Sequence, residues 1–240
     1  MPNTRLFDRS IIRLSPTETD EDVRQFLQGL VTQDTAADMP SYAGLLSPQG
    51  KALFDFLLWA DGDDVLIDCE RAQADALIRR LSMYRLRRKI AIAIDAACGV
   101  FWSAEGSSDP RHADLGKRWL GALSADDIDV SAAFRAHRLA LGVTEGLAEL
   151  GSDQTLWLET NAAELNGVSF SKGCYVGQEN TARMNWRQKV NRRLVVVPLS
   201  DADPKRQRVA LDQLGLSVEL RRVEDMAGLD LPEWQRAAIS

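Results

Sequence analysis

The sequence contains few residues that hold metals or form covalent cross-links. Among its 240 residues are two histidines and three cysteines. Cys69, Cys98 and Cys174 are odd in number and far apart, which fits neither a disulfide framework nor a Cys-x-x-Cys metal motif. His112 and His137 do not stand at ligand spacing from each other or from a cysteine. We therefore expect no permanent protein-only metal site, and a chain that works in a reducing compartment.

Long apolar stretches are also missing. A membrane-spanning helix needs about 20 consecutive apolar residues, and the sequence contains no such run. Residues 1–20 lack the continuous apolar segment of a secretory signal peptide. Together with the cysteine usage, these absences predict a cytoplasmic protein that makes no membrane contact.

Positive charge is not in excess. Lysine and arginine number 29 against 35 acidic residues, and the net charge is -6 at pH 7. General binding to nucleic acid profits from a basic surface, so we expect no strong general nucleic-acid binding. A local basic run is typical of a solvated helix face or, less commonly, of an anion site. Here that run comprises Arg79, Arg80, Arg85, Arg87, Arg88 and Lys89.

Hydrophobic periodicity predicts an α+β fold. Alternating or continuous apolar residues predict strands over residues 11–14, 52–58, 65–67, 90–94 and 194–197, with a hairpin turn at 61–64. Helical spacing predicts helices over residues 20–30, 71–80 and 126–141. We expect Thr19 to cap the first helix, because acidic residues that suit the helix dipole follow it. Such a succession of strands and helices is typical of the α+β class.

The densest chemistry lies in the run Lys172-Gly173-Cys174-Tyr175-Val176-Gly177-Gln178-Glu179. Two glycines flank its thiol, at positions where the backbone can need a positive φ. A nearby lysine can lower the pKa of a thiol and raise its thiolate fraction. The alternative is a polar surface turn whose cysteine is only a small hydrophobe. Outside this run, Asp34 either closes a turn or presents a carboxylate to a ligand.

Residues 172–179, together with Arg183 and the upstream residues 166–170, resemble the signature of the YgfZ family of folate-binding proteins, which help to mature iron-sulfur enzymes. The resemblance extends through residues 26–34, 46–51, 84–87 and 138–142, and covers roughly residues 1–195. This family is similar in fold to the T-protein of the glycine cleavage system. That protein is a tetrahydrofolate-dependent aminomethyltransferase whose subdomains form a ring around a folate pocket.

The resemblance implies a T-protein-like and YgfZ-like α+β fold, with mixed sheets and helices in a ring. Residues 1–195 would form the folate-binding domain. Residues 196–240 would form a truncated or degenerate β domain in place of a full β-barrel, or a partner would supply that wall. The chain also departs from the family pattern at Trp186-Arg187-Gln188-Lys189, where a basic-glycine turn is usual.

The resemblance further implies that the cofactor is tetrahydrofolate or a folate derivative, with Cys174 near the mouth of the central opening. Phe134 would stack on the pterin, although a core aromatic is the alternative. Glu179 would accept hydrogen bonds from the pterin, while Lys172 and Arg183 would meet the carboxylates of folate. The full set expected to bind the cofactor is Lys172, Tyr175, Gln178, Glu179, Arg183, Phe134 and Asp34. The thiolate of Cys174 suits iron or a sulfur-bearing intermediate, so we expect it to carry the chemistry.

Three functions follow from these observations. The first is a tetrahydrofolate-binding accessory protein that supports maturation or repair of iron-sulfur enzymes, with iron-sulfur client or assembly proteins as partners. The second is a folate-dependent aminomethyltransferase, which is less favoured because Arg135-Ala136-His137-Arg138 stands where the T-protein has a Gly-Ala-Arg-Asp type signature. The third is a folate-free interaction protein, suggested by the shortened carboxyl end.

Overall fold

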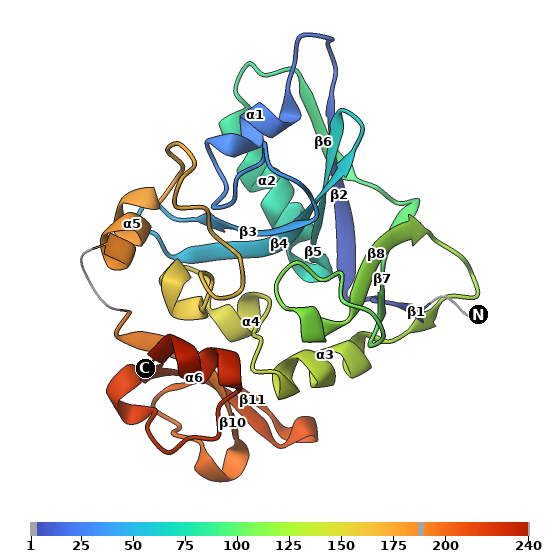
Figure 1. Ribbon diagram of the computed structural model, residues 1–240. Coiled ribbons are helices and arrows are strands. Elements are labelled where there is room, and N and C mark those ends of the chain that lie inside the picture. The colour runs from blue at the N-terminus through green and yellow to red at the C-terminus, as the bar shows by residue number, and fades with distance from the viewer. Residues whose placement is uncertain (1–3, 187–189, 240) are drawn as a thin grey trace.

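The computed structural model describes residues 4–186 and 190–239, and its framework is three β-sheets with helices packed around them (Figure 1). The first sheet is antiparallel in the order β3-β4-β5-β2-β6, with β2 (Arg9–Pro16), β3 (Ser41–Leu46), β4 (Ala52–Asp61), β5 (Asp64–Glu70) and β6 (Ile90–Ile94). The second has the order β8-β7-β1-β9, with β1 (Thr4–Arg5), β7 (Cys98–Ser103), β8 (Lys117–Ala122) and β9 (Ile128–Asp129). The third has the order β10-β12-β11, with β10 (Arg192–Pro198), β11 (Gln207–Leu211) and β12 (Leu216–Arg222). This mixture of sheets and helices confirms the predicted α+β class.

The α-helices are α1 (Val23–Gln28), α2 (Ala74–Arg85), α3 (Ser131–Ala140), α4 (Leu147–Leu150), α5 (Gln178–Trp186) and α6 (Glu233–Ile239). In Figure 1, α1 and α2 lie beside the first sheet, α3 lies below the second, and α6 lies over the third. Within the described residues, no helix combines the length and the apolar character that crossing a membrane requires.

The apolar stripes seen in the sequence pack the first two helices against the first sheet. Val23, Phe26 and Leu27 of α1 are buried, as are Leu77 and Leu81 of α2. All five belong to one core with the inward side chains of the first sheet. The spacing of three and four residues places each set on one side of its helix, which is why the periodicity predicted these helices.

Two predicted helix starts are wrong. The N-cap of α1 is Asp22, whose carboxylate accepts a hydrogen bond from the backbone N–H of Gln25 at 3.0 Å, so Thr19 lies outside the helix. Helix α3 begins at Ser131 rather than at residue 126, because β9 occupies part of the expected helix. Strand β9 pairs in parallel with β1, and this long-range pairing outweighs the local helical pattern.

The C-terminal residues form an open three-stranded sheet and α6, with no closed barrel among the described residues. The indole N–H of Trp234 donates to the carbonyl oxygen of Leu141 at 2.9 Å, and Asn161 Nδ2 donates to that of Leu194 at 2.9 Å. The first bond joins α6, and the second joins the third sheet, to the rest of the chain. The expected division between residues 195 and 196 falls inside β10, and the division into domains stays a prediction. Residues 187–189 of the unusual turn lie outside the described residues.

A cluster of paired charges fills the junction between the first and second sheets. Arg9 on β2 and Arg118 on β8 each contact the carboxylate of Asp68 on β5, both at 2.7 Å. Glu145 contacts Arg9 at 3.1 Å and also pairs with Arg111. All five side chains are buried. Burial alone would raise the pKa of Glu145, but Arg9, Arg111 and Arg118 outweigh it and hold that pKa well below its usual range.

Candidate functional site

The loop that carries Cys174 is held from inside by Lys172. The side chain of Lys172 is buried, and its Nζ donates to the backbone carbonyls of Val31 at 2.7 Å and Gln33 at 2.9 Å. The same Nζ lies 5.1 Å from the centre of the Tyr175 ring. Burial lowers the pKa of Lys172 to about 8, although the carboxylate of Asp34 acts in the opposite direction. Lys172 therefore fastens its loop to the segment that follows α1.

Hydrogen bonds join these two segments at further points. The Thr32 hydroxyl donates to the carbonyl of Gly167 at 2.7 Å, and the amide N–H of Ser169 donates to the carbonyl of Thr32 at 3.0 Å. Gln33 Nε2 donates to the carbonyl of Asn166 at 2.7 Å. Two stretches far apart in the sequence thus form one connected unit beneath the Cys174 loop.

A second attachment lies after Cys174, where Gly177 meets the turn between β3 and β4. Gly177 has φ +82°, and a Cβ there would lie 2.5 Å from the carbonyl oxygen of Ser47 and 3.0 Å from Cα of Gly50. Gly177 is therefore required both for its backbone conformation and for this close approach. A Cβ at Gly173 would meet no atom within 4 Å, and Gly173 does not have a positive φ. Only one of the two flanking glycines thus needs to be glycine.

The three cysteines differ in exposure. Cys174 is exposed, Cys98 is partly buried and Cys69 is buried. Burial raises the pKa of the Cys69 thiol to about 12 and also raises the pKa of Cys98. These two shifts favour the unreactive thiol form. Cys174 is therefore the most accessible of the three thiols.

The other residues of the 172–183 stretch divide between the core and the surface. Tyr175 is buried and packs in the core that joins the first and third sheets. Gln178 begins α5 and is partly buried. Glu179 and Arg183 form an ion pair of 2.7 Å one turn apart on α5, with side chains 84% and 48% exposed. That pair faces solvent rather than the interior of the protein.

Phe134 and Asp34 occupy separate structural positions. Phe134 is 2% exposed on α3, with its ring centre 5.2 Å from that of Trp102. The guanidinium carbons of Arg118 and Arg111 lie 5.2 Å and 5.9 Å from the same ring centre. Asp34 accepts 3.0 Å hydrogen bonds from Gln28 Nε2 and from the backbone of Ala36, which is the geometry of a turn. The structure thus brings Asp34, Lys172 and Tyr175 together, and leaves Phe134 in a different part of the core.

The helix that follows the Cys174 loop carries a surface groove. It has a volume of about 250 Å³ and is lined by Glu179, Ala182, Arg183 and Trp186. Trp186 is 72% exposed, and Phe170, which precedes Cys174 in the loop, is 36% exposed. Trp186 thus gives the groove an exposed apolar side chain that another protein could contact. The sequence showed these aromatics but gave no sign of their exposure.

No family model matches the sequence. The sequence is 30% identical over 246 residues to the human protein "Iron-sulfur cluster assembly factor IBA57, mitochondrial", covering 83% of this chain and 67% of that protein. The mouse protein of the same name is 30% identical over 244 residues, with the same coverage. The homologue from Mycosarcoma maydis is 32% identical over 230 residues, covering 80% of this chain and 55% of that protein.

One solved structure shows the same fold. The glycine cleavage system aminomethyltransferase T from Bartonella henselae superimposes with a TM-score of 0.59 at 12% identity, covering 92% of this chain and 78% of that one. The T-protein-like fold implied by the sequence is therefore confirmed.

Two expectations need correction in light of these relatives. The expected cytoplasmic location is contradicted, because the matched relatives are mitochondrial proteins and point to the mitochondrion instead. The YgfZ resemblance identified the right broad group but not the family itself, since the relatives found are IBA57 proteins, which are related to YgfZ and the T-protein. At 30% identity over two thirds of the human protein, this chain belongs to the IBA57 family.

Proposed function

We propose that this protein is an iron-sulfur cluster assembly factor that acts through the thiol of Cys174. The relatives named as iron-sulfur cluster assembly factors support this role. The observation that carries it is the exposure of Cys174 on a loop fastened at both ends, by Lys172 and by Gly177. A thiol held in this way is accessible without being freely mobile.

The chemistry of the loop fits a metal site whose ligands come from this protein and from a partner. A thiolate is a soft ligand suited to iron and to sulfur-bearing species. A stable iron-sulfur cluster usually takes four ligands, whereas Cys69 and Cys98 lie in the first and second sheets, away from the Cys174 loop. Within residues 4–186 and 190–239, no three His, Cys, Asp or Glu side chains gather as a metal site. The remaining ligands would come from an iron-sulfur client or assembly protein docked beside α5, where Trp186 is exposed.

Folate binding stays a prediction. The residues expected to hold the cofactor lie in three places: beneath the Cys174 loop, on the solvent face of α5, and in the core at Phe134. They do not fit a folate as one set, so no step of this proposal uses folate. Calorimetric titration with tetrahydrofolate tests the prediction directly, and saturable binding would confirm it.

The proposed role of Cys174 is tested by complementation with matched thiol variants. In cells depleted of their own IBA57 protein, we expect Cys174→Ala to leave the activity of an iron-sulfur enzyme at the level of depleted cells. Cys98→Ala, which also removes one thiol, should restore that activity as the unaltered protein does. Circular dichroism of both purified variants checks that they fold. Full complementation by Cys174→Ala would refute the role of the thiol.

A further inference from the structure

In the basic run around the end of α2, some side chains contact other parts of the chain and others do not. Arg85 donates to the carbonyl oxygen of Ile90 at 3.0 Å, and Arg80 lies over the ring of Tyr84 at 5.7 Å. Further along the chain, the guanidinium of Arg88 pairs with the carboxylate of Glu21, and the ammonium of Lys89 lies 3.4 Å from that of Glu18. Four of the six cations thus support the fold.

Arg79 and Arg87 are the two cations of this run with no ion pair, side-chain hydrogen bond or ring contact among the described residues. Both are exposed. Between them in sequence stand Met83, which is 67% exposed, and Leu86, which is 86% exposed. We call Arg79, Met83, Leu86 and Arg87 the α2 face. It combines free positive charge with large apolar side chains that no other part of the described chain covers.

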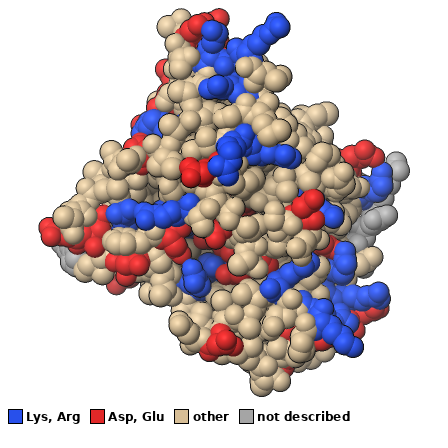
Figure 2. Space-filling view, turned by 180° about the vertical axis from the view of Figure 1, so that it is seen from behind, with Lys and Arg blue, Asp and Glu red and all other residues tan. Residues whose placement is uncertain are grey.

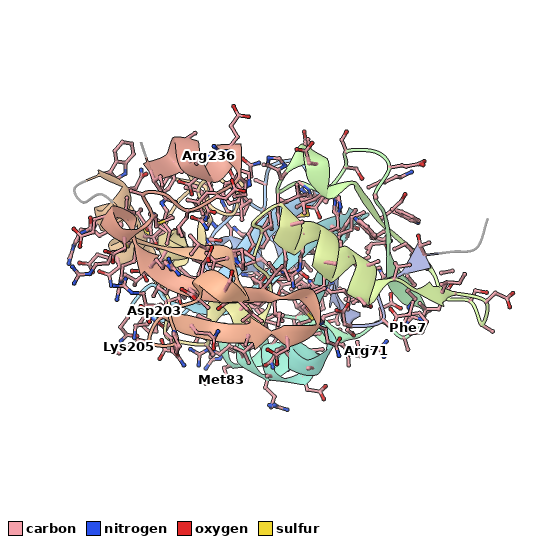
Figure 3. All side chains as sticks on the ribbon, turned by 90° about the horizontal axis from the view of Figure 1, so that it is seen from below. Phe7, Arg71, Met83, Asp203, Lys205 and Arg236 are labelled. Carbon is pink, nitrogen blue, oxygen red and sulfur yellow. The ribbon has the colours of Figure 1, made fainter. Side chains whose placement is uncertain are left out.

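The geometry of α2 explains why these side chains point outward. Leu77 and Leu81 face the core, whereas Arg79 and Met83, one turn apart, lie on the opposite side of the helix. Figure 2 shows Lys and Arg side chains gathered over the position of α2 on the side hidden in Figure 1. In Figure 3, Met83 lies on the outer side of α2, on the opposite edge of the molecule from Arg236 of α6.

Leu86 adds a backbone feature to this surface. It follows the last residue of α2 with φ +50° and ψ -110°, a region that costs energy for a residue with a branched side chain. A glycine would be the ordinary choice at a helix end with positive φ. Here a leucine takes that conformation while almost its whole side chain faces solvent. Neither packing nor helix capping within this chain accounts for a leucine at this position.

We propose that the α2 face docks an acidic amphipathic segment of a partner protein. Its carboxylates would pair with Arg79 and Arg87, and its apolar side chains would cover Met83 and Leu86. Charge complementarity favours such a segment over nucleic acid or an anionic membrane. Two free cations on a chain of net charge -6 offer little attraction to an extended anionic surface, whereas a short acidic helix can match two charges flanking an apolar centre.

The test uses fluorescence anisotropy with a labelled synthetic peptide that places leucines on one face of a helix and glutamates on either side. The full-length protein should bind this peptide saturably and should not bind a matched peptide with lysine in place of glutamate. Arg79→Glu and Arg87→Glu should each weaken binding about tenfold. Met83→Ser/Leu86→Ser should weaken it by at least as much, because the apolar contacts are lost. Thermal unfolding should be unchanged, since all four side chains are exposed.

The matched control is Lys205→Glu, which makes the same charge change at an exposed residue of the C-terminal region and should leave peptide binding unchanged. The proposal is overturned if the acidic peptide does not bind, if the lysine peptide binds equally well, or if Lys205→Glu weakens binding as much as Arg79→Glu does. Sedimentation with phosphatidylglycerol-containing vesicles tests the membrane alternative. Vesicle binding that Arg79→Glu and Arg87→Glu abolish, without peptide binding, would also overturn the proposal.

Discussion

The centre of the molecule and the Cys174 loop differ in whether their polar groups are buried or exposed. In the centre, Arg9, Arg118 and Asp68 are sealed from solvent and paired with one another. In the loop, one buried ammonium and a close glycine contact hold the backbone, and the thiol of Cys174 stays exposed. The comparison separates stability from reactivity. Charges paired inside the protein maintain the fold, whereas the group left accessible is the one available to a partner.

Removing one charge from the centre should have the largest effect. Asp68→Asn keeps the shape of the side chain but removes the buried carboxylate that Arg9 and Arg118 both contact at 2.7 Å. Breaking a buried ion pair from one side costs about 3–5 kcal/mol, and urea unfolding measures this loss. Glu179→Gln breaks an exposed pair on α5 instead and should cost less than about 1 kcal/mol. Equal losses in the two variants would show that the centre is not the stabilising region.

A substitution at the attachment of the loop should have an intermediate effect. In Gly177→Ala, the added Cβ meets the carbonyl of Ser47 in a conformation that alanine rarely adopts. We expect a loss of about 1–3 kcal/mol in unfolding free energy. We also expect faster reaction of Cys174 with a thiol reagent, because the loop is released. Gly173→Ala is the matched control and should change both quantities little, since its Cβ meets no atom. Similar results for both glycines would contradict the assigned role of Gly177.

What the sequence predicted correctly depends mainly on neighbouring residues. The paired strands β4 and β5 follow from alternation and a short turn, and α1 follows from its apolar stripe. The choice between Asp22 and Thr19 as the cap was missed because several acidic and hydroxyl residues compete within one turn. The start of α3 was missed because β9 forms only by pairing with β1, which lies more than 120 residues earlier in the sequence.

The central ion cluster could not be predicted from the sequence. Arg9, Asp68 and Glu145 are far apart along the chain, and each taken alone is typical of a surface charge. Arg9 and Asp68 become partners through the pairing of β2 with β5, and Glu145 reaches Arg9 from the loop between α3 and α4. The site prediction had the same limit. The sequence identified residues 172–179 as one run, but it could not show that Lys172 points inward and Glu179 points outward, because these directions depend on the fold. The composition of the sequence could not distinguish cytoplasm from mitochondrion.

The smallest expected effect concerns the pH dependence that Lys172 gives the loop. Its pKa is about 8 in the folded protein, against about 10.4 for an ordinary lysine. Between these pH values the unfolded chain keeps a proton that the folded protein has lost, so unfolding free energy should rise with pH. The neutral amine still donates to Val31 and Gln33 through its remaining N–H groups. Lys172→Met cannot titrate, so its stability should lack this rise. Urea unfolding from pH 7.5 to 10.5 compares the two proteins, and parallel curves would contradict the assignment.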